Sequence, residues 1–486
     1  MKTLSLKTNM VLNAFRSVLS LLFPLITFPY VSRVLGAENL GKYNFSNSIV
    51  SYFVMISALG IYSYAVREGA QFRNQKDRFS RFANEVFSIN ILSTLIAYAL
   101  LFISLASISK LHDYNILIYI LSLQIVLKTL SVEWIYTIYE DFLYITLRSI
   151  VIQIVSLVLL FIFVKSQNDL YAYTIVVTLA TAGSSMFNYL YVKKYHSFKF
   201  VKTLNLKSHA KPILIIFATS IAITIFVSSD VTILGFLCDD TTVGIYSVSV
   251  KVYTIIKQVM IAILSVVIPR LAFYLGKKEL DKFKNTVDDL FKTMISILLP
   301  AVVGIFVLGK EIVYIVGGNQ FISAYTSLQL LSIALIFCMF SWSWGQCVLI
   351  TFKQEKLLLI STVVSAVVNV VFNLILIPFY RENAAAFTTI LAEAISMGIN
   401  WWYGRKYIRV DNLFKVTAKV LLGCFIITMI TIVLRCYKWN NIFIFSIFDI
   451  TLCALGYLLT EIIVKNEVLI GMLNQLREKI AKRSDK

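Results

Sequence analysis

The chain has few of the residues on which metalloproteins and disulfide-rich proteins depend. Its 486 residues include only six Cys, three His and six Pro, and charged residues make up 15% of the sequence. A soluble domain carries about 25% charged residues. The cysteines form no CxxC or CxH spacing and the histidines are never clustered. We therefore expect no structural zinc site, disulfide framework or thiol catalyst.

Motifs for catalysis and nucleotide binding are also missing. The sequence contains no phosphate-binding loop of the form GxxxxGKS/T, which argues against direct use of ATP. No paired carboxylates and no Ser/His arrangement stand out above chance. We therefore expect a protein that is not an enzyme and that holds no metal and no cofactor. A coupling ion, either a proton or sodium, is left open.

Hydrophobic residues, in contrast, are abundant. They make up 58% of the chain, against about 45–50% in soluble domains, and an excess of this size must face lipid. Because a membrane-spanning helix needs about 20 mostly apolar residues, the apolar runs predict an all-α polytopic membrane protein with about fourteen transmembrane helices. The predicted helices are 10–32, 43–66, 83–108, 114–137, 142–164, 169–192, 210–236, 243–269, 286–308, 325–351, 357–379, 384–403, 416–434 and 442–464. The fourth and fifth are the least clearly separated.

Positive charge is distributed unevenly over the predicted loops. With a cytoplasmic N-terminus, the cytoplasmic segments hold 30 Lys and Arg and the opposite loops hold 8. Cytoplasmic loops carry such an excess under the positive-inside rule, so both termini are predicted to be cytoplasmic. The net charge of +19 therefore reflects topology, not nucleic-acid binding. The predicted loops are short on both faces, which leaves no room for a soluble catalytic domain.

One segment of the chain is repeated. Residues 35–52 and 234–253 each join one long helix to the next through a Gly-x-Tyr turn, in which Tyr43 corresponds to Tyr246. Both copies enter the membrane from the same side, so the repeat is parallel, about an axis along the membrane normal. This predicts an N-terminal lobe of helices 1–6 (1–192), a basic cytoplasmic linker (193–211), a C-terminal lobe of helices 7–12 (212–404), and two further helices with a basic cytoplasmic tail (405–486).

Polar residues inside the predicted spans fall on single helix faces. Polar groups within a membrane are costly and usually face protein or water. Because the helices that carry the repeat also carry these stripes, we expect the stripes to line a central cavity. The alternative is that they hydrogen-bond neighbouring helices to one another. The predicted lining residues are Asn9, Asn13, Asn47, Ser51, Ser247, Thr254, Gln258, Asn369 and Asn373.

Several basic residues fall within the predicted spans. Lys251 is predicted to lie roughly 12 Å inside the outer boundary, near the middle of the membrane, where snorkelling is difficult. Lys and Arg bind phosphate through charge-assisted hydrogen bonds, so basic residues within the membrane predict an anionic substrate. The candidate binding residues are Arg16, Lys251, Arg33, Lys128, Arg148, Lys257, Arg67 and Arg270. The candidate coupling or ion-pair acids are Asp230, Glu68 and Glu133, while Glu85 and Glu393 also fall in or near spans.

The segment from Phe23 to Gly36, with the sequence FPLITFPYVSRVLG, resembles Wzx-type polysaccharide flippases. These belong to the multidrug/oligosaccharidyl-lipid/polysaccharide (MOP) exporter superfamily. The resemblance continues at 41–46, 64–68, 230–235, 244–246 and 373–378. One departure is Phe379-Tyr380-Arg381-Glu382-Asn383, which replaces the usual small residues after Pro378.

This resemblance implies a MATE-like fold of two six-helix lobes around a cationic cavity, working by alternating access. The implied function is to move undecaprenyl-pyrophosphate-linked oligosaccharide repeat units to the outer leaflet for O-antigen or capsule biosynthesis. The implied location is the bacterial cytoplasmic membrane. The implied partners are the lipid-linked oligosaccharide, the bilayer, a polysaccharide polymerase and the chain-length machinery, without nucleic acid.

Three alternatives remain open. The first is a multidrug exporter, or an exporter of another lipid-linked precursor such as a lipid II-like molecule. Buried cations argue against cationic drugs. The second, of a different class, is a membrane-embedded polysaccharide polymerase or ligase, which usually needs a sizeable outside loop. The third is a scaffold in an envelope-synthesis complex, which would not need charged residues at mid-membrane.

Overall fold

The computed structural model describes the backbone of residues 6–201, 206–411, 413–437 and 441–466, together with 439, 468, 470 and 471. Side chains are described from Phe23 onward, except those of 206–208. Over these ranges the chain is mostly helical and contains no strand. The predicted all-α class is therefore confirmed.

Twelve helical segments within the described residues are long and apolar enough to cross a membrane. Up to residue 237 the helices are α1 (Leu6–Ala58), α2 (Ile61–Gly69), α3 (Lys76–Ser107), α4 (Asn115–Leu130), α5 (Glu133–Ile138), α6 (Phe142–Phe163), α7 (Leu170–Thr178), α8 (Ser184–Tyr191) and α9 (Leu206–Leu237). They are followed by α10 (Asp240–Ser265), α11 (Ile268–Gly276), α12 (Leu280–Val307), α13 (Gly309–Gly317), α14 (Ala324–Trp342), α15 (Glu355–Gly404), α16 (Leu413–Arg435) and α17 (Ile442–Ile463). The π-helical segments Leu179–Gly183 and Ser343–Leu349 continue α7 and α14.

Two of these spans, in α1 and α15, are each two helices joined at a single residue. Gly36 interrupts α1 with φ 76° and ψ 176°, and Arg381 interrupts α15 with φ 50° and ψ −130°. The twelve spans are thus consistent with fourteen membrane crossings. We expected a loop over 33–42, but the chain turns at Gly36 alone, because glycine adopts a positive φ without steric cost.

Further helix boundaries also differ from the prediction. The helix expected over 43–66 ends at Ala58, where Leu59 and Gly60 adopt φ values of 46° and 69° before α2 begins. The fourth and fifth predicted helices are clearly separate, since a break after Ile138 precedes α6. The short helix α13 was not predicted, because nine residues give no membrane-spanning signal.

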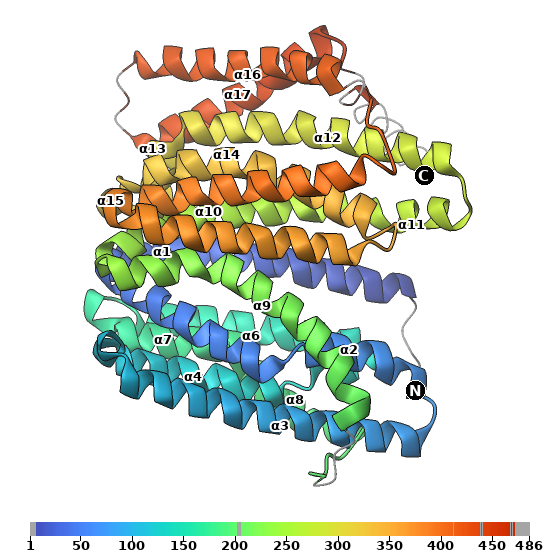
Figure 1. Cartoon of the computed structure of the whole chain (residues 1–486). Coiled ribbons are helices and arrows are strands. Elements are labelled where there is room, and N and C mark those ends of the chain that lie inside the picture. Colours follow the sequence, from blue (N-terminus) through green and yellow to red (C-terminus); the bar gives the residue numbers. More distant parts are fainter. Residues whose placement is uncertain are drawn as a thin grey trace, which may run out of the picture. The chain divides into compact units, whose positions relative to one another are not determined.

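The chain divides into two compact units, unit 1 (1–247) and unit 2 (248–486). The predicted lobe boundaries at 192 and 212 stay a prediction. In unit 1, α1 packs against α3, α4, α6 and α9. In unit 2, α14 packs against α12 and α15, and α16 lies against α12 and α17 (Figure 1).

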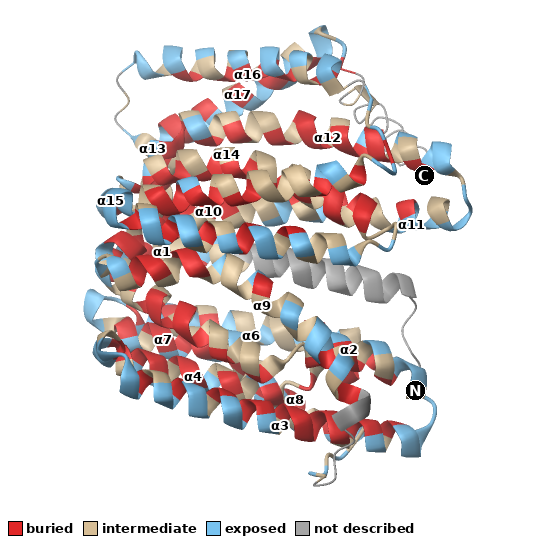
Figure 2. Ribbon diagram, viewed as in Figure 1, coloured by how far each residue is buried: buried red, intermediate tan, exposed pale blue. Residues whose placement is uncertain are grey.

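Large apolar side chains are exposed along the outer helices, as contact with lipid requires. On α17, for example, Ile447 and Ile463 are 68% and 77% exposed. Figure 2 shows buried residues along the helix sides that face neighbours within a unit, with exposed residues on the outer sides of α16 and α17. The exposed surface of these helices is therefore suited to a hydrocarbon environment.

The repeated segments meet each other within unit 1. A Cβ atom on Gly41 would collide with the carbonyl oxygen of Asp240, and one on Gly244 would collide with the carbonyl oxygen of Ala37. The separation between Ala37 and Asp240 is the same as that between Gly41 and Gly244. The contact is therefore reciprocal, and each glycine permits a backbone approach that any other residue would block.

Candidate functional site

Unit 1 contains a polar cavity of about 360 Å³ lined by α4, α5, α6 and the π-helical segment between α7 and α8. The π-helical residues Ala180, Thr181 and Ala182 are small and leave space in the bundle. Such π-helical turns are rare and frequently occur at functional sites. The residues that line the cavity are Val54, Gln124, Lys128, Ser131, Glu133, Arg148, Ser149, Ile152, Gln153, Ala180, Thr181, Ala182, Ser184, Ser185 and Asn188.

Arg148 is the central charged group of this cavity. Its side chain is 8% exposed and donates from Nη2 to Oε1 of Glu133 at 3.1 Å, while Nη1 donates to Oδ1 of Asn188. Its Nε is buried and has no hydrogen-bond partner among the described residues. The guanidinium is therefore held in one orientation, and one of its N–H groups is left without a partner among those residues.

The surrounding helices fix this arrangement. The side-chain Nδ2 of Asn188 donates to the backbone carbonyl oxygen of Ser131 at 2.8 Å, and the backbone carbonyl oxygen of Asn188 accepts from the hydroxyl of Tyr136. Val132, with φ 34°, lies between α4 and α5 and directly precedes the start of α5 at Glu133. The break between α4 and α5 thus carries the acid that positions Arg148.

The structure brings together three residues that were predicted from the sequence as separate candidates. Lys128 and Arg148 were predicted as substrate-binding cations and Glu133 as an ion-pair acid, and all three line the cavity. Gln124 and Asn188 were not predicted. Neither shows any signal in the sequence beyond being a polar residue inside a span, because their partners lie on other helices.

In unit 2, α10 carries two of the predicted cations. Lys251 is partly buried and interacts with other groups. Lys257 lies 3.5 Å from Oε1 of Glu393 on α15, and the hydroxyl of Tyr253 donates to the same oxygen at 3.3 Å. Lys257 is also 5.5 Å from the centre of the Tyr253 ring. Glu393 was noticed only as an acid near a span, and its pairing with Lys257 depends on the fold.

Two of the predicted lining residues form a closed network in α15. Asn373 donates to Oδ1 of Asn369 at 3.1 Å and accepts from the hydroxyl of Thr388 at 2.5 Å. All three side chains are buried. The network joins the two helices of α15 across the break at Arg381.

The remaining predicted residues occupy varied positions. Asn9, Asn13 and Arg16 lie outside the described side chains. Arg33, Arg67, Arg270 and Gln258 are exposed, Asn47, Ser51 and Thr254 are partly buried, and Ser247 and Asp230 are buried. Within this set, Arg67 pairs with Glu68 at 3.0 Å, Arg270 donates to the hydroxyl of Tyr274, Ser51 contacts Ser228, and Asp230 accepts from the hydroxyl of Tyr246 at 2.8 Å.

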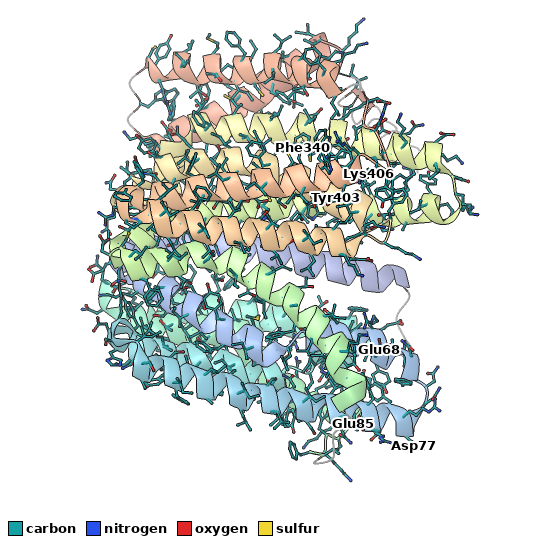
Figure 3. The ribbon with its side chains drawn as sticks, viewed as in Figure 1. Glu68, Asp77, Glu85, Phe340, Tyr403 and Lys406 are labelled. Carbon is teal, nitrogen blue, oxygen red and sulfur yellow. The ribbon has the colours of Figure 1, made fainter. Side chains whose placement is uncertain are left out.

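Unit 2 also contains a larger cavity of about 1150 Å³ with a mainly apolar lining. Its lining includes the aromatic residues Phe340 and Trp344, the basic residues Lys406 and Arg409, and the acidic residue Asp411. Figure 3 labels Phe340 on α14 and Lys406 in the segment just after α15. A mainly apolar cavity that also carries cations is suited to an amphiphile with negative charge.

The chemistry available at these sites is binding, without a nucleophile placed beside a base. Among the described residues, no group of three or more His, Cys, Asp or Glu could hold a metal ion. Arg148 in the unit 1 cavity offers a fixed guanidinium of the kind that recognises phosphate or carboxylate oxygens. The sites are therefore suited to holding a charged or oxygen-rich ligand.

Comparisons with known proteins agree in both sequence and fold. The family model described as "Polysaccharide biosynthesis protein" matches residues 6–274, and the model described as "MatE" matches residues 212–375. The "Putative O-antigen transporter" of Escherichia coli (strain K12) is 24% identical over 403 residues, which cover 81% of this chain and 95% of that protein. The "Probable low-salt glycan biosynthesis flippase Agl15" of Haloferax volcanii is 26% identical over 181 residues, which cover 37% of this chain and 38% of that protein.

Among solved structures, "Lipid II flippase MurJ, inward closed conformation" has a TM-score of 0.76 with 16% identity. The match covers 94% of this chain and 99% of that one. At this level of identity the likeness shows a shared fold, which confirms the predicted MATE/MOP-like architecture.

Proposed function

This chain belongs to the polysaccharide biosynthesis protein family, and on that premise we propose that it is a flippase for lipid-linked oligosaccharides. Its substrate is an undecaprenyl-pyrophosphate-linked repeat unit, which moves from the cytoplasmic to the outer leaflet by alternating access. The family match over more than half of the chain supports this proposal, as do the Wzx-type motifs of the MOP superfamily in its first 70 residues.

The observation that carries the proposal is the buried, fixed guanidinium of Arg148 at a polar cavity within an apolar bundle. A pyrophosphate head must cross about 30 Å of hydrocarbon, and a bare anion loses its hydration there at a cost of many kcal/mol. Fixed cations replace that hydration. Arg148 and Lys128 supply such charges in unit 1, and Lys251 supplies one in unit 2.

The larger cavity of unit 2 supports an amphiphilic substrate. Aromatic side chains such as Phe340 and Trp344 line it together with the basic side chain of Lys406. A polyprenyl chain is compatible with the aromatic side chains and a phosphate with the basic one. A purely polar sugar substrate would leave the aromatic side chains without a function.

The orientation and location follow from the same proposal. The 30-to-8 distribution of Lys and Arg favours cytoplasmic N- and C-termini, in a bacterial cytoplasmic membrane. Delivery of repeat units to the outer leaflet requires a polymerase and chain-length machinery to use them there. A proton or sodium gradient, not ATP, would drive turnover.

One other candidate function is supported by a specific finding. The MatE model matches residues 212–375, which favours an exporter of drugs or of another lipid-linked precursor. Cationic drugs would be repelled by Arg148, Lys128 and Lys251, so we rank this function second. The two functions differ in the charge of the substrate.

The test is deletion of the gene in its native host, followed by complementation. We expect the deletion strain to lose surface polysaccharide and to accumulate lipid-linked repeat units that glycan-cleaving enzymes cannot reach from outside. The wild-type gene should restore export, and Lys251→Glu should not, because it places a negative charge beside the anionic substrate. Normal surface polysaccharide in the deletion strain would contradict the proposal.

A further inference from the structure

Near the start of α9, three titratable side chains from three helices form a buried hydrogen-bonded chain. The hydroxyl of Tyr64 on α2 lies 2.6 Å from Nδ1 of His209 on α9, and Nε2 of His209 lies 2.7 Å from Oε2 of Glu85 on α3. Tyr64 is 3% exposed, and His209 and Glu85 are each 6% exposed. Figure 3 shows Glu85 near the first turns of α9. We call these residues the Tyr64–His209–Glu85 triad.

The partners of the triad determine where its protons lie. Arg81 donates from Nε to the second carboxylate oxygen of Glu85 at 3.0 Å, so Glu85 is the ionised, accepting member. Nε2 of His209 therefore carries a hydrogen and donates it to Glu85. With a neutral imidazole, Nδ1 accepts the hydroxyl hydrogen of Tyr64. Every member is then satisfied.

The triad can take up one more proton without breaking a covalent bond. A proton that binds at Nδ1 turns the imidazole into an imidazolium, which donates from both nitrogens. The tyrosine oxygen then accepts from Nδ1, and its own hydroxyl hydrogen rotates away. The product is a cation that faces the Glu85 carboxylate. Other charged residues on the packed helices are Arg67 and Glu68 of α2, which pair with each other at 3.0 Å. Three more lie in the first turn of α3 (Lys76, Asp77 and Arg78), and α9 carries Lys207, Lys211 and Asp230.

Apolar contacts already attach this end of α9. Ile213 is 3% exposed in a cluster with Ile61 and Phe82, and Ile216 packs where a Cβ atom on Gly60 would lie. A buried pair of titratable groups is often no more stabilising than aliphatic residues of the same size. Attachment alone therefore does not explain why a histidine and a glutamate occupy this position.

We propose that His209 is a proton-binding site through which cytoplasmic protons control the docking of α9 on α2 and α3. A bound proton creates an imidazolium–carboxylate pair that exists only while α9 is docked, so proton binding favours the docked end. Release of the proton favours undocking. The role of His209 in transport rests on the proposed function, and in that role the proton is the coupling ion. The role of His209 in docking does not depend on the substrate.

The docking role is tested without any substrate. Ile213→Cys places a thiol on the docked face, with the exposed native Cys436 kept as a reference and the other five cysteines replaced by alanine. When the pH is raised from about 5.5 to about 7.5, labelling of Cys at 213 relative to Cys436 should rise about threefold or more. His209→Gln keeps an amide donor for Glu85 but cannot titrate, so the ratio should stay flat.

The other two histidines provide matched controls. His196 contacts Oδ1 of Asn84 at 2.9 Å, burial lowers its pKa, and His112 contacts the carbonyl oxygen of Leu105. His196→Gln and His112→Gln should keep the pH response of labelling, and so should Tyr64→Phe, which keeps the imidazole of His209. A response that survives in His209→Gln, in protein with an unchanged thermal unfolding temperature, would overturn the proposal. If His209→Gln does not fold, loss of the response in Tyr64→Phe would overturn it instead.

The coupling role is tested in proteoliposomes that contain a fluorescent lipid-linked glycan. An imposed proton gradient should change the translocation rate of the wild type by up to about tenfold per pH unit, and that dependence should vanish in His209→Gln. An equal dependence in both proteins would overturn the coupling role. If the wild type moves no glycan while the labelling response is present, the proposed function fails and proton-controlled docking stands.

Discussion

Two buried polar clusters, one in each unit, look alike in the sequence and differ in the structure. The cluster of Asn369, Asn373 and Thr388 in unit 2 is closed, because its members bond to one another across the break in α15. The Arg148 cluster in unit 1 is open, because it lines a cavity and keeps a buried N–H group without a partner among the described residues. The difference indicates that a polar stripe marks a binding site only when its hydrogen-bonding capacity is not used up within the bundle.

The largest effect should come from reversing the charge of the open cluster. Arg148→Glu places a second carboxylate beside Glu133 in a low-dielectric site and removes the cation from the cavity. We expect export to fall to about 1% of wild type, together with a loss of stability of about 3 kcal/mol or more from the uncompensated buried charge. Surface-polysaccharide assays and thermal unfolding of the purified protein would measure the two effects.

The matched control for this change is the double variant Arg148→Glu/Glu133→Arg, which restores the ion pair in the opposite direction. We expect it to recover most of the stability but little of the export, since the guanidinium then belongs to residue 133 on α5 and no longer to residue 148 on α6. Full recovery of export would show that Arg148 acts only as the ion-pair partner of Glu133. The Arg148 cluster would then be a structural cluster, like that of Asn369, Asn373 and Thr388, and not a binding site.

A smaller effect is expected from the closed cluster. Asn373→Leu removes one partner from each of Asn369 and Thr388, and we expect a loss of stability of about 1–3 kcal/mol from the buried hydrogen bonds that are broken. Export per correctly folded molecule should stay within about twofold of wild type. Thr362→Val is the control, because Thr362 donates only to the carbonyl of Leu358 within its own helix. A large loss of export from folded Asn373→Leu would place the closed cluster in the transport path.

The smallest effect on stability and export is expected at Lys257. Its ion pair with Glu393 has not been assigned to either the open or the closed kind of cluster. Lys257→Met alone leaves Glu393 without its cation, whereas Lys257→Met with Glu393→Gln removes both charges. Buried ion pairs can often be replaced by neutral residues. We therefore expect the free energy of unfolding of the double variant to lie within about 1 kcal/mol of that of the wild type. Export within about twofold of wild type would class the pair as closed, and a tenfold loss would class it as open. Thermal unfolding of the wild type, the two single variants Lys257→Met and Glu393→Gln, and the double variant forms a double-mutant cycle that gives the coupling energy between the two side chains.

Much of the helical layout was predictable, because lipid leaves a long apolar run few other structures to adopt. The predicted spans 142–164, 416–434 and 442–464 lie within a few residues of α6, α16 and α17. The sharp break at Gly36 was missed, since a single residue with positive φ leaves the hydropathy of its neighbours unchanged. Arg381 shows the converse, because the departure from the family pattern at 379–383 falls where the helix breaks.

The candidate site was predictable in its residue types but not in its pairings. Lys128, Arg148 and Glu133 were named because ionisable residues in spans are rare and usually functional. The contact between Lys257 and Glu393, or between His209 and Glu85, joins residues more than 120 positions apart. No periodicity within one helix reports such a contact. His209 was passed over because an isolated histidine in a sequence has no spacing that distinguishes it.

The reciprocal contact of Gly41 with Asp240 and of Gly244 with Ala37 also bears on the history of the chain. Gly41 corresponds to Gly244 in the repeat, and Ala37 corresponds to Asp240. Each repeat therefore uses the same two positions to contact the other repeat, as the two subunits of a two-fold symmetric homodimer do. A gene for one such subunit, duplicated and fused, would pass this isologous interface on as an internal one. Both glycines would then descend from a single ancestral glycine that faced its own copy across the symmetry axis.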